Sequence, residues 1–290
     1  MITREIAEMI AKKVEERLEE TSCSVVEKFK INGEKAIGIS VNRIDYKAAP
    51  VIYLDEAMEE FTEKMADMIV EKYEEIPKED LEMIEKTGRI TREKVIDNVV
   101  FRIINANQNV NLLADVPHFE FLNLAVIYSV PLGIDFRGMH ASFKVTNEIA
   151  SQMKISDREL YEASLNNTIS HYNFEIISME QMLESMGMAG AQTDEMPLYV
   201  CTGKEKMNGA AILLYPQYFH EIAEKEESDL YIIPSSIHEV LAIPTKFVAN
   251  PCDLKKMCND VNNAEVLPEE QLGNTIYRYR RSYNDFIISC

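Results

Sequence analysis

The sequence predicts an α+β fold in which strands form antiparallel or mixed hairpins and helices pack on one side of the sheets. Helical and strand-like patterns alternate without the regular β-α-β order of a doubly wound sheet. The strand-like segments also occur in neighbouring pairs separated by turn residues. A chain of 290 residues with 46% apolar side chains is long enough to bury a core as one large domain or two smaller ones.

The N-terminal third is expected to form a helix, a hairpin, a short strand and a second helix. Apolar residues recur every three or four positions over residues 2–18, which predicts an amphipathic helix. Two strands are expected around Asn32 and Gly33, a dipeptide that favours a tight hairpin turn. A short strand over 51–54 precedes a second amphipathic helix over 55–73.

The middle of the chain is expected to add a third helix, a hairpin with a long loop, and two short helices. The third helix spans residues 91–105, and the hairpin spans 118–146. Ser156 and Ser178 each precede a Glu or Gln by three residues, the capping-box pattern that marks the start of a helix.

In the last third, strand and helix patterns alternate. The expected strands span residues 197–202, 209–215, 229–234, 239–244 and 274–281, and the expected helices span 216–226 and 253–264. We divide the chain into an acidic helix-hairpin-helix region over 1–105 and an α+β region over 106–290, with one continuous domain as the alternative.

Charge and apolar patterning indicate a cytoplasmic protein. No stretch approaches the ~18 consecutive apolar residues of a spanning helix, and the first twenty residues are too charged for a signal peptide. A net charge of −19 disfavours direct binding to nucleic acids or to an anionic membrane. The cysteines are odd in number and scattered, which predicts reduced thiols rather than a disulfide framework. They are Cys23, Cys201, Cys252, Cys258 and Cys290.

Acidic residues are concentrated in residues 55–97, which carry fifteen acidic and seven basic side chains. One interpretation is a solvated helical face that keeps the protein in solution. The other is a docking surface for a protein partner, of which a basic or nucleic-acid-binding protein is one candidate. The candidate residues of this surface are Asp55, Glu56, Glu59, Glu60 and Glu63.

The densest group of reactive side chains is Ser235, Ser236, His238 and Glu239, with Tyr215 as an additional candidate. In an extended segment Ser236 and His238 would share one face and Glu239 the other, which disfavours a catalytic triad. The alternatives are a polar binding or hydrolytic site and a bend whose hydroxyls satisfy backbone groups.

No cofactor or metal is expected. The histidines lack metal-ligand spacing, and neither standard phosphate-binding loop occurs. Arg278, Arg280 and Arg281 alternate with tyrosines and could contact a nucleic acid. In so acidic a chain, internal ion pairs or pairing with the acidic face of another copy are the favoured interpretation of these arginines.

Three segments, residues 98–128, 197–224 and 229–244, carry a resemblance to a known family. They resemble the uncharacterised family of gut Firmicutes called domain of unknown function 5688. This resemblance implies a cytoplasmic bacterial protein, often encoded among the accessory genes of conjugative or other mobile elements. It brings no activity, cofactor or catalytic residue.

The leading hypothesis is therefore a non-enzymatic accessory protein of a mobile element that binds a protein partner through its acidic surface. A hydrolase with its site at Ser235, Ser236, His238 and Glu239 is one alternative. The second is a module that captures a peptide along a strand edge, which predicts an unpaired edge strand beside an apolar groove. The sequence indicates neither the oligomeric state nor a small ligand.

Overall fold

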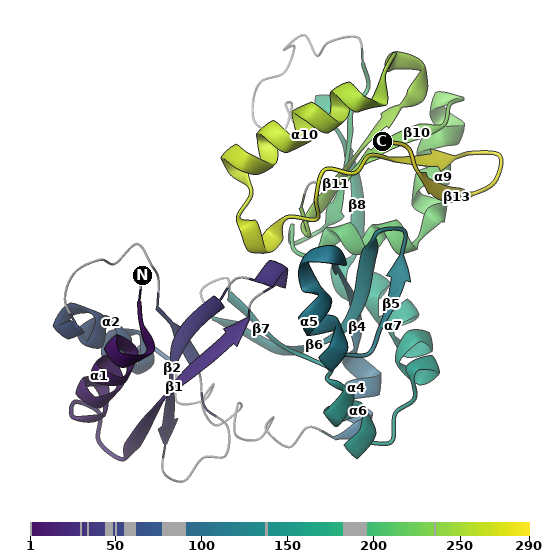
Figure 1. The fold of residues 1–290 in the computed structure, drawn as a ribbon. Coiled ribbons are helices and arrows are strands. Elements are labelled where there is room, and N and C mark those ends of the chain that lie inside the picture. The colour runs from purple at the N-terminus through teal and green to yellow at the C-terminus, as the bar shows by residue number, and fades with distance from the viewer. Residues whose placement is uncertain are drawn as a thin grey trace. The chain divides into compact units, whose positions relative to one another are not determined.

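The computed structural model forms two compact units (Figure 1), which are described separately. Unit 1 comprises Met1–Lys94 and Pro131–Ser142, and unit 2 comprises Val95–Val130 and Phe143–Cys290. The boundary expected at residue 105 falls inside unit 2. The structure describes residues 2–29, 31–33, 35–43, 49, 51–54, 62–76, 91–136, 139–181, 196–234 and 236–290.

Unit 1 is a three-stranded antiparallel sheet with two helices on one face. The sheet order is β1-β2-β3, and its elements are α1 (Arg4–Glu15), β1 (Thr21–Phe29), β2 (Lys35–Arg43), β3 (Val51–Tyr53) and α2 (Thr62–Glu74). The predicted hairpin is confirmed, because β1 pairs with β2 and Asn32 and Gly33 both have positive φ. Helix α1 begins after Thr3, whose hydroxyl accepts a hydrogen bond from the N–H of Ile6.

The core of unit 1 lies between the sheet and the two helices. Ile10 and Val14 of α1 and Ile69 of α2 are fully buried, and they belong to the same apolar cluster as Ile39 and Val41 of β2. Because side chains alternate along a strand, Cys23 and Val25 of β1, which pair with Val41 and Ile39, face the same cluster.

Unit 2 contains two antiparallel sheets. In the first, β4 (Val100–Asn105), β6 (Leu124–Phe136) and β5 (His118–Phe121) are adjacent in that order, and β7 (Met139–Lys144) pairs with β6. Residues 131–136 of β6 and 139–142 of β7 belong to unit 1. The second has the order β13-β12-β10-β11-β9-β8. These strands are β8 (Phe174–Ser178), β9 (Tyr199–Gly203), β10 (Leu230–Ile233), β11 (Glu239–Pro244), β12 (Tyr277–Arg280) and β13 (Asp285–Ile288).

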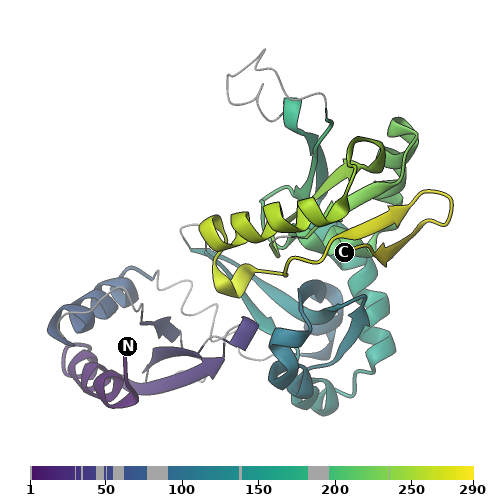
Figure 2. The ribbon, with the colours of Figure 1, turned by 45° about the horizontal axis from the view of Figure 1, so that its top comes forward.

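The helices of unit 2 cover both of its sheets. They are α4 (Arg92–Asn98), which begins in unit 1, α5 (Val110–Asp115), α6 (Asn147–Gln152), α7 (Asp157–Tyr172), α9 (Pro216–Glu226) and α10 (Pro251–Glu265). Helix α10 lies across one face of the six-stranded sheet in both views (Figures 1 and 2) and packs on Ile233 and Ile243. Phe219 of α9 contacts Tyr279 on the opposite face. The α+β class is confirmed, and helices cover both faces of this sheet.

Several predicted elements are wrong in detail. The helix expected over 91–105 ends at Asn98 and is followed by β4. Val100, Phe101, Ile103 and Ile104 are buried on both faces of this strand, a pattern that periodicity cannot distinguish from a helix. The strand expected over 209–215 is a 3₁₀ helix, Gly209–Leu214. Strands β8 and β13 were not anticipated.

The prediction that all cysteines are reduced is also wrong, since Cys252 and Cys290 form a disulfide. Cys23, Cys201 and Cys258 are free thiols. Within the described part of the chain, no helix has the length and apolar character needed to cross a membrane.

Candidate functional site

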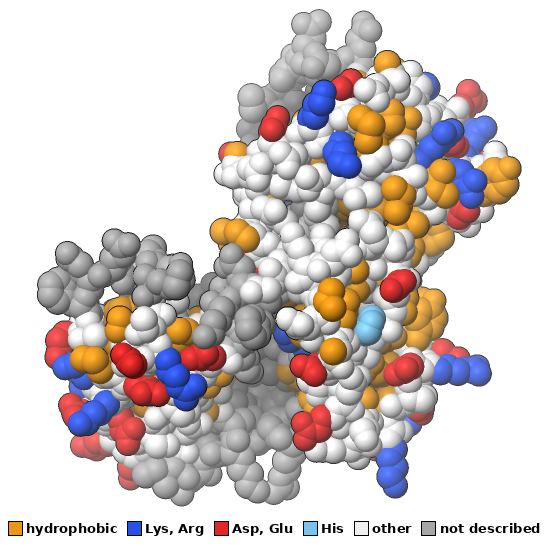
Figure 3. Space-filling model, viewed as in Figure 1, with side chains coloured by type: hydrophobic (Ala, Val, Ile, Leu, Met, Phe, Trp, Pro, Cys, Tyr) orange, Lys and Arg blue, Asp and Glu red, His pale blue; other side chains and the backbone are white. Residues whose placement is uncertain are grey.

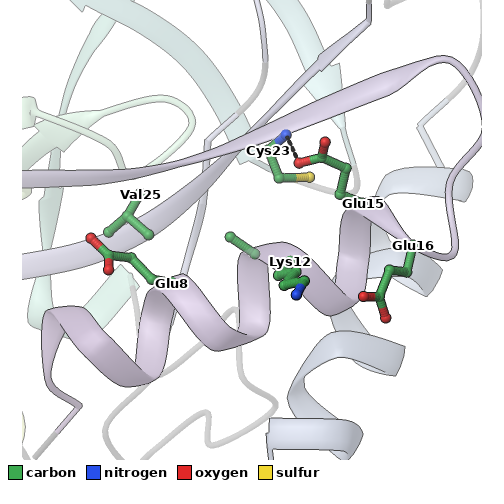
Figure 4. A pocket seen from close by; sticks show the side chains of 7 residues that line it. Glu8, Lys12, Glu15, Glu16, Cys23 and Val25 are labelled. Atoms are coloured by element: carbon green, nitrogen blue, oxygen red, sulfur yellow. Dashed lines mark hydrogen bonds between the residues drawn. The ribbon is translucent and has the colours of Figure 1, made fainter.

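A groove runs between α1 and the outer strand β1 of unit 1 (Figure 4). Its cavity measures about 360 Å³, within the range of ligand sites in proteins. Ala11, Cys23 and Val25 supply its apolar surface, and four charged side chains complete it, three from α1 and one from its C-cap residue, Glu16. These are Glu8, Lys12, Glu15 and Glu16. The helical spacing of 8, 11, 12, 15 and the C-cap residue 16 places all five residues on the side of the helix beside the strand.

Strand β1 is an edge strand among the described strands, because it pairs with β2 alone. The N–H of Cys23 donates a hydrogen bond to Oε2 of Glu15 at 3.1 Å, shown as a dashed line in Figure 4. This N–H therefore points away from β2. Because backbone groups alternate in direction along a strand, the N–H and C=O of Val25 point the same way. The groove is thus bordered by backbone groups that can pair with a further strand.

In unit 2, a backbone N–H at the edge of a sheet bonds to a buried side chain instead of an exposed one. The outer strand β4 packs beside α7, and its Phe101 N–H donates to the hydroxyl of Thr168 at 2.8 Å, with Thr168 fully buried. In unit 1 the group that caps the edge is Glu15, an exposed and charged side chain. The exposed Glu15 side chain can release the backbone N–H without opening a buried core, whereas the buried Thr168 side chain cannot.

The environment of the groove changes the pKa of the Cys23 thiol. Burial and the nearby charge of Glu15 raise the pKa of its thiol to about 11. The thiolate is the reactive form, and an ordinary cysteine has a pKa near 8.5. A raised pKa therefore makes Cys23 unreactive at neutral pH.

Alkylation of Cys23 by iodoacetamide at pH 8 is expected to be on the order of 10²-fold slower than that of a free thiol and to accelerate up to about pH 11. Peptide mass spectrometry after timed labelling gives the rate at each pH. The same protein in urea is the control and should react as a free thiol. Equal rates with and without urea at pH 8 would contradict the raised pKa.

The predicted acidic surface has one described residue. Asp55, Glu56, Glu59 and Glu60 lie outside the described residues. Glu63, in the first turn of α2, accepts hydrogen bonds from Lys13 and Arg17 of α1.

These contacts, with the Lys13 bond as the largest cause, lower the pKa of Glu63. Acidic and basic side chains are accordingly intermingled on the face of unit 1 in Figure 3. Glu63 joins two helices within unit 1, so its charge is already balanced.

The Ser236–Glu239 segment forms a bend that leads into β11. Ser235 lies outside the described residues. The hydroxyl of Ser236 is buried and accepts hydrogen bonds from the N–H groups of His238 and Glu239 at 3.1 and 3.3 Å. Tyr215 is also buried, and its hydroxyl donates to the carbonyl of Leu165 on α7. The described hydroxyls thus satisfy backbone groups, as the bend interpretation expects.

Both ring nitrogens of His238 have partners. Its Nδ1 faces the N–H of Asn208 at 3.3 Å, and its Nε2 lies 3.1 Å from the carboxylate of Glu270, which sequence analysis did not single out. Burial lowers the pKa of Arg102, and the nearby charge of Glu270 opposes this shift. A general base needs a free nitrogen beside a nucleophile. His238 has none in this arrangement, and a hydrolytic role for this segment stays a prediction.

The arginines near the C-terminus form internal ion pairs, the first of the two favoured interpretations, and pairing with another copy stays a prediction. Arg278 pairs with Asp229 at 2.7 Å and Arg280 with Asp285 at 2.6 Å. Arg281 lies 3.6 Å from Glu224. These contacts account for the basic and aromatic pattern of β12 through packing of unit 2 on itself. Among the described residues, no group of three potential metal ligands occurs.

The groove was not predicted at these residues. Sequence analysis placed a helix and a strand here, but whether β1 is an edge strand, as it is among the described strands, depends on which strands pair in three dimensions. The carboxylates at positions 8, 15 and 16, spaced along one face of the first helix, were the available signal.

Among the described residues, the fold and groove define an α+β protein with a strand edge beside a helix. The chain belongs to the family of unknown function DUF5688, whose model matches residues 3–281. Comparison with curated proteins and with solved structures found no match.

Proposed function

We propose that the protein binds a protein partner by adding an extended segment of that partner to the edge of β1. The observation that supports this most directly is the outward-facing backbone of β1 beside the cavity of the α1–β1 groove. In such binding, backbone hydrogen bonds supply affinity and alternate side chains in a groove supply specificity. This is the peptide-capture alternative from sequence analysis, now assigned to defined residues. The groove differs from the apolar one expected there, because four of its seven lining residues are charged.

The charge of the groove indicates the kind of segment that fits. Three carboxylates and one ammonium line it, so basic side chains are favoured over acidic ones. This agrees with a basic or nucleic-acid-binding protein as the partner. In this proposal the acidic docking surface is formed by the carboxylates of the groove at α1 and not by residues 55–63. We also propose that this binding occurs in a bacterial cytoplasm and that the protein is an accessory protein of a mobile element, as the resemblance implied.

The affinity expected from the edge alone is modest. Cys23 and Val25 offer up to four backbone hydrogen bonds, each worth about 0.5–1.5 kcal/mol net. The apolar surface of Ala11, Cys23 and Val25 adds the burial of one or two aliphatic side chains. Association also costs translational and rotational freedom, so we expect micromolar binding for a short peptide.

Val25→Pro is expected to weaken binding of a strand-forming peptide at least tenfold, because proline removes an outward N–H and blocks strand addition. The probe is a fluorescein-labelled nine-residue peptide of alternating valine and threonine with a central lysine on the valine face. Fluorescence anisotropy gives its dissociation constant.

The matched control is Tyr53→Pro, on β3 at the opposite edge of the same sheet and 41% exposed. Circular dichroism verifies that both variants fold. Equal binding by wild type and Val25→Pro, or equal loss in both proline variants, would reject β1 as the binding edge.

A further inference from the structure

The carboxylate of Glu15 occupies a backbone position that an incoming strand would use. Its Oε2 accepts the Cys23 N–H at 3.1 Å, where the carbonyl of an added strand would accept it. We infer that Glu15 is an internal substitute for the partner strand and selects a partner that places a basic side chain opposite Cys23. This inference rests on the proposed function and adds to it a specificity-determining residue and a ligand class.

The direction of the side chains on an added strand follows from β1. Cys23 faces the same cluster as Val41 and Ile39, on the side of the sheet that α1 covers. In an antiparallel pair, directly opposed residues point to the same face with Cβ atoms about 5 Å apart. The partner residue opposite Cys23 therefore points toward the C-terminal part of α1, where Glu15 and Glu16 lie (Figure 4).

Displacing Glu15 leaves its charge without the Cys23 hydrogen bond. A hydrogen bond to a carboxylate is stronger than one to a neutral carbonyl, so a strand with a neutral side chain exchanges a better acceptor for a poorer one. A lysine or arginine opposite Cys23 compensates for the lost hydrogen bond, because the released carboxylate of Glu15 forms an ion pair with it. Glu15 thus opposes neutral strands and favours basic ones.

The residue two positions away on the partner meets a different surface. It lies opposite Val25, near Ala11 and Glu8. Glu8 is already paired with Arg4 at 3.0 Å, and Ala11 is buried. An aliphatic side chain fits here. The ligand class is therefore an extended segment with a basic residue and an aliphatic residue at alternate positions on one face.

Glu15→Gln tests the inference because it is expected to act in opposite directions on two peptides. Binding of the lysine peptide should weaken about threefold to fivefold, the range of an exposed ion pair. Its twin with a central glutamine should bind about twofold tighter, because a neutral amide holds the Cys23 N–H less strongly than a carboxylate does. Anisotropy titrations of both peptides measure the two changes.

Glu16→Gln is the matched control, one residue away on the same helix. It removes the same charge from the groove, but the carboxylate of Glu16 makes no described hydrogen bond to β1. It should weaken the lysine peptide and leave the glutamine peptide unchanged. Amide hydrogen exchange at Cys23 supplies a second readout. The free Glu15→Gln protein should exchange faster than wild type, and bound peptide should remove the difference.

Two failures can be told apart. If wild type binds both peptides and Glu15→Gln changes them in the same direction and degree as Glu16→Gln does, the role of Glu15 is overturned while strand addition stands. If wild type binds neither peptide, both the role of Glu15 and the proposed function are overturned.

Discussion

Replacing Gly209 by alanine is expected to destabilise unit 2 by about 3 kcal/mol or more, a severe effect for one added methyl group. A Cβ at this position would lie 2.5 Å from the carbonyl oxygen of His238 and 2.7 Å from the carbonyl carbon of Thr202, and closer still to the N of Gly203. All three are backbone atoms, so no side-chain rotation can relieve the overlap. The hydrogen bond from the Gly209 N–H to the His238 carbonyl, 3.0 Å long, would have to open.

Thermal denaturation monitored by circular dichroism measures this effect, and Gly203→Ala is the graded control. A Cβ on Gly203 would meet the carbonyl oxygens of Tyr172 and Met207 at 3.1 and 3.2 Å, a tight contact that small shifts relieve. We expect Gly203→Ala to lower the melting temperature clearly less than Gly209→Ala does. Equal losses in the two variants would show that close backbone approach at Gly209 is not what holds the bend at His238 against the 3₁₀ helix.

The same glycine illustrates what the sequence could not reveal. Residues 209–213 are buried all round, so the segment shows neither the period of a helix nor that of a strand, and its apolar run suggested a strand. Its 3₁₀ form depends on hydrogen bonds to Ile237 and His238, about 28 residues away. By contrast, Asn32 and Gly33 determine their turn locally through positive φ, and that hairpin was predicted correctly.

The candidate sites also differ in how far the sequence could reveal them. Ser236, His238 and Glu239 were selected because reactive side chains are dense there, and the structure directs the Ser236 hydroxyl to backbone N–H groups. The groove of unit 1 needed two facts that no local pattern contains. One is that β1 pairs on one side only among the described strands. The other is that Glu15 folds back onto Cys23, eight residues later in the chain.

Reduction of the Cys252–Cys290 disulfide is the second large effect expected, at roughly 4 kcal/mol of lost stability in the chain-entropy model for a loop of this length. The bond joins the first turn of α10 to the last residue across a sequence separation of 38. The C-terminal residue is also held by two backbone hydrogen bonds with Ile276, so β12 and α10 are linked through it. Without the covalent link, the segment that ends at Cys290 is still held by these bonds, by the pairing of β13 with β12 and by partial burial of Cys290.

The measurement is the melting temperature of unit 2 with and without a thiol reductant. A loss of about 4 kcal/mol corresponds to a decrease of roughly 8–15 °C for a unit of this size. Cys252→Ser should have the melting temperature of reduced wild type, and the reductant should not change it. Cys23→Ser, in unit 1, should show the same decrease with reductant as wild type does. An unchanged melting temperature in reduced wild type would show that β12 and α10 hold together without the bond. Because cytosolic thiols are usually kept reduced, the reduced form would be the one present in the cytoplasmic location proposed above, and its stability sets whether unit 2 stays folded there.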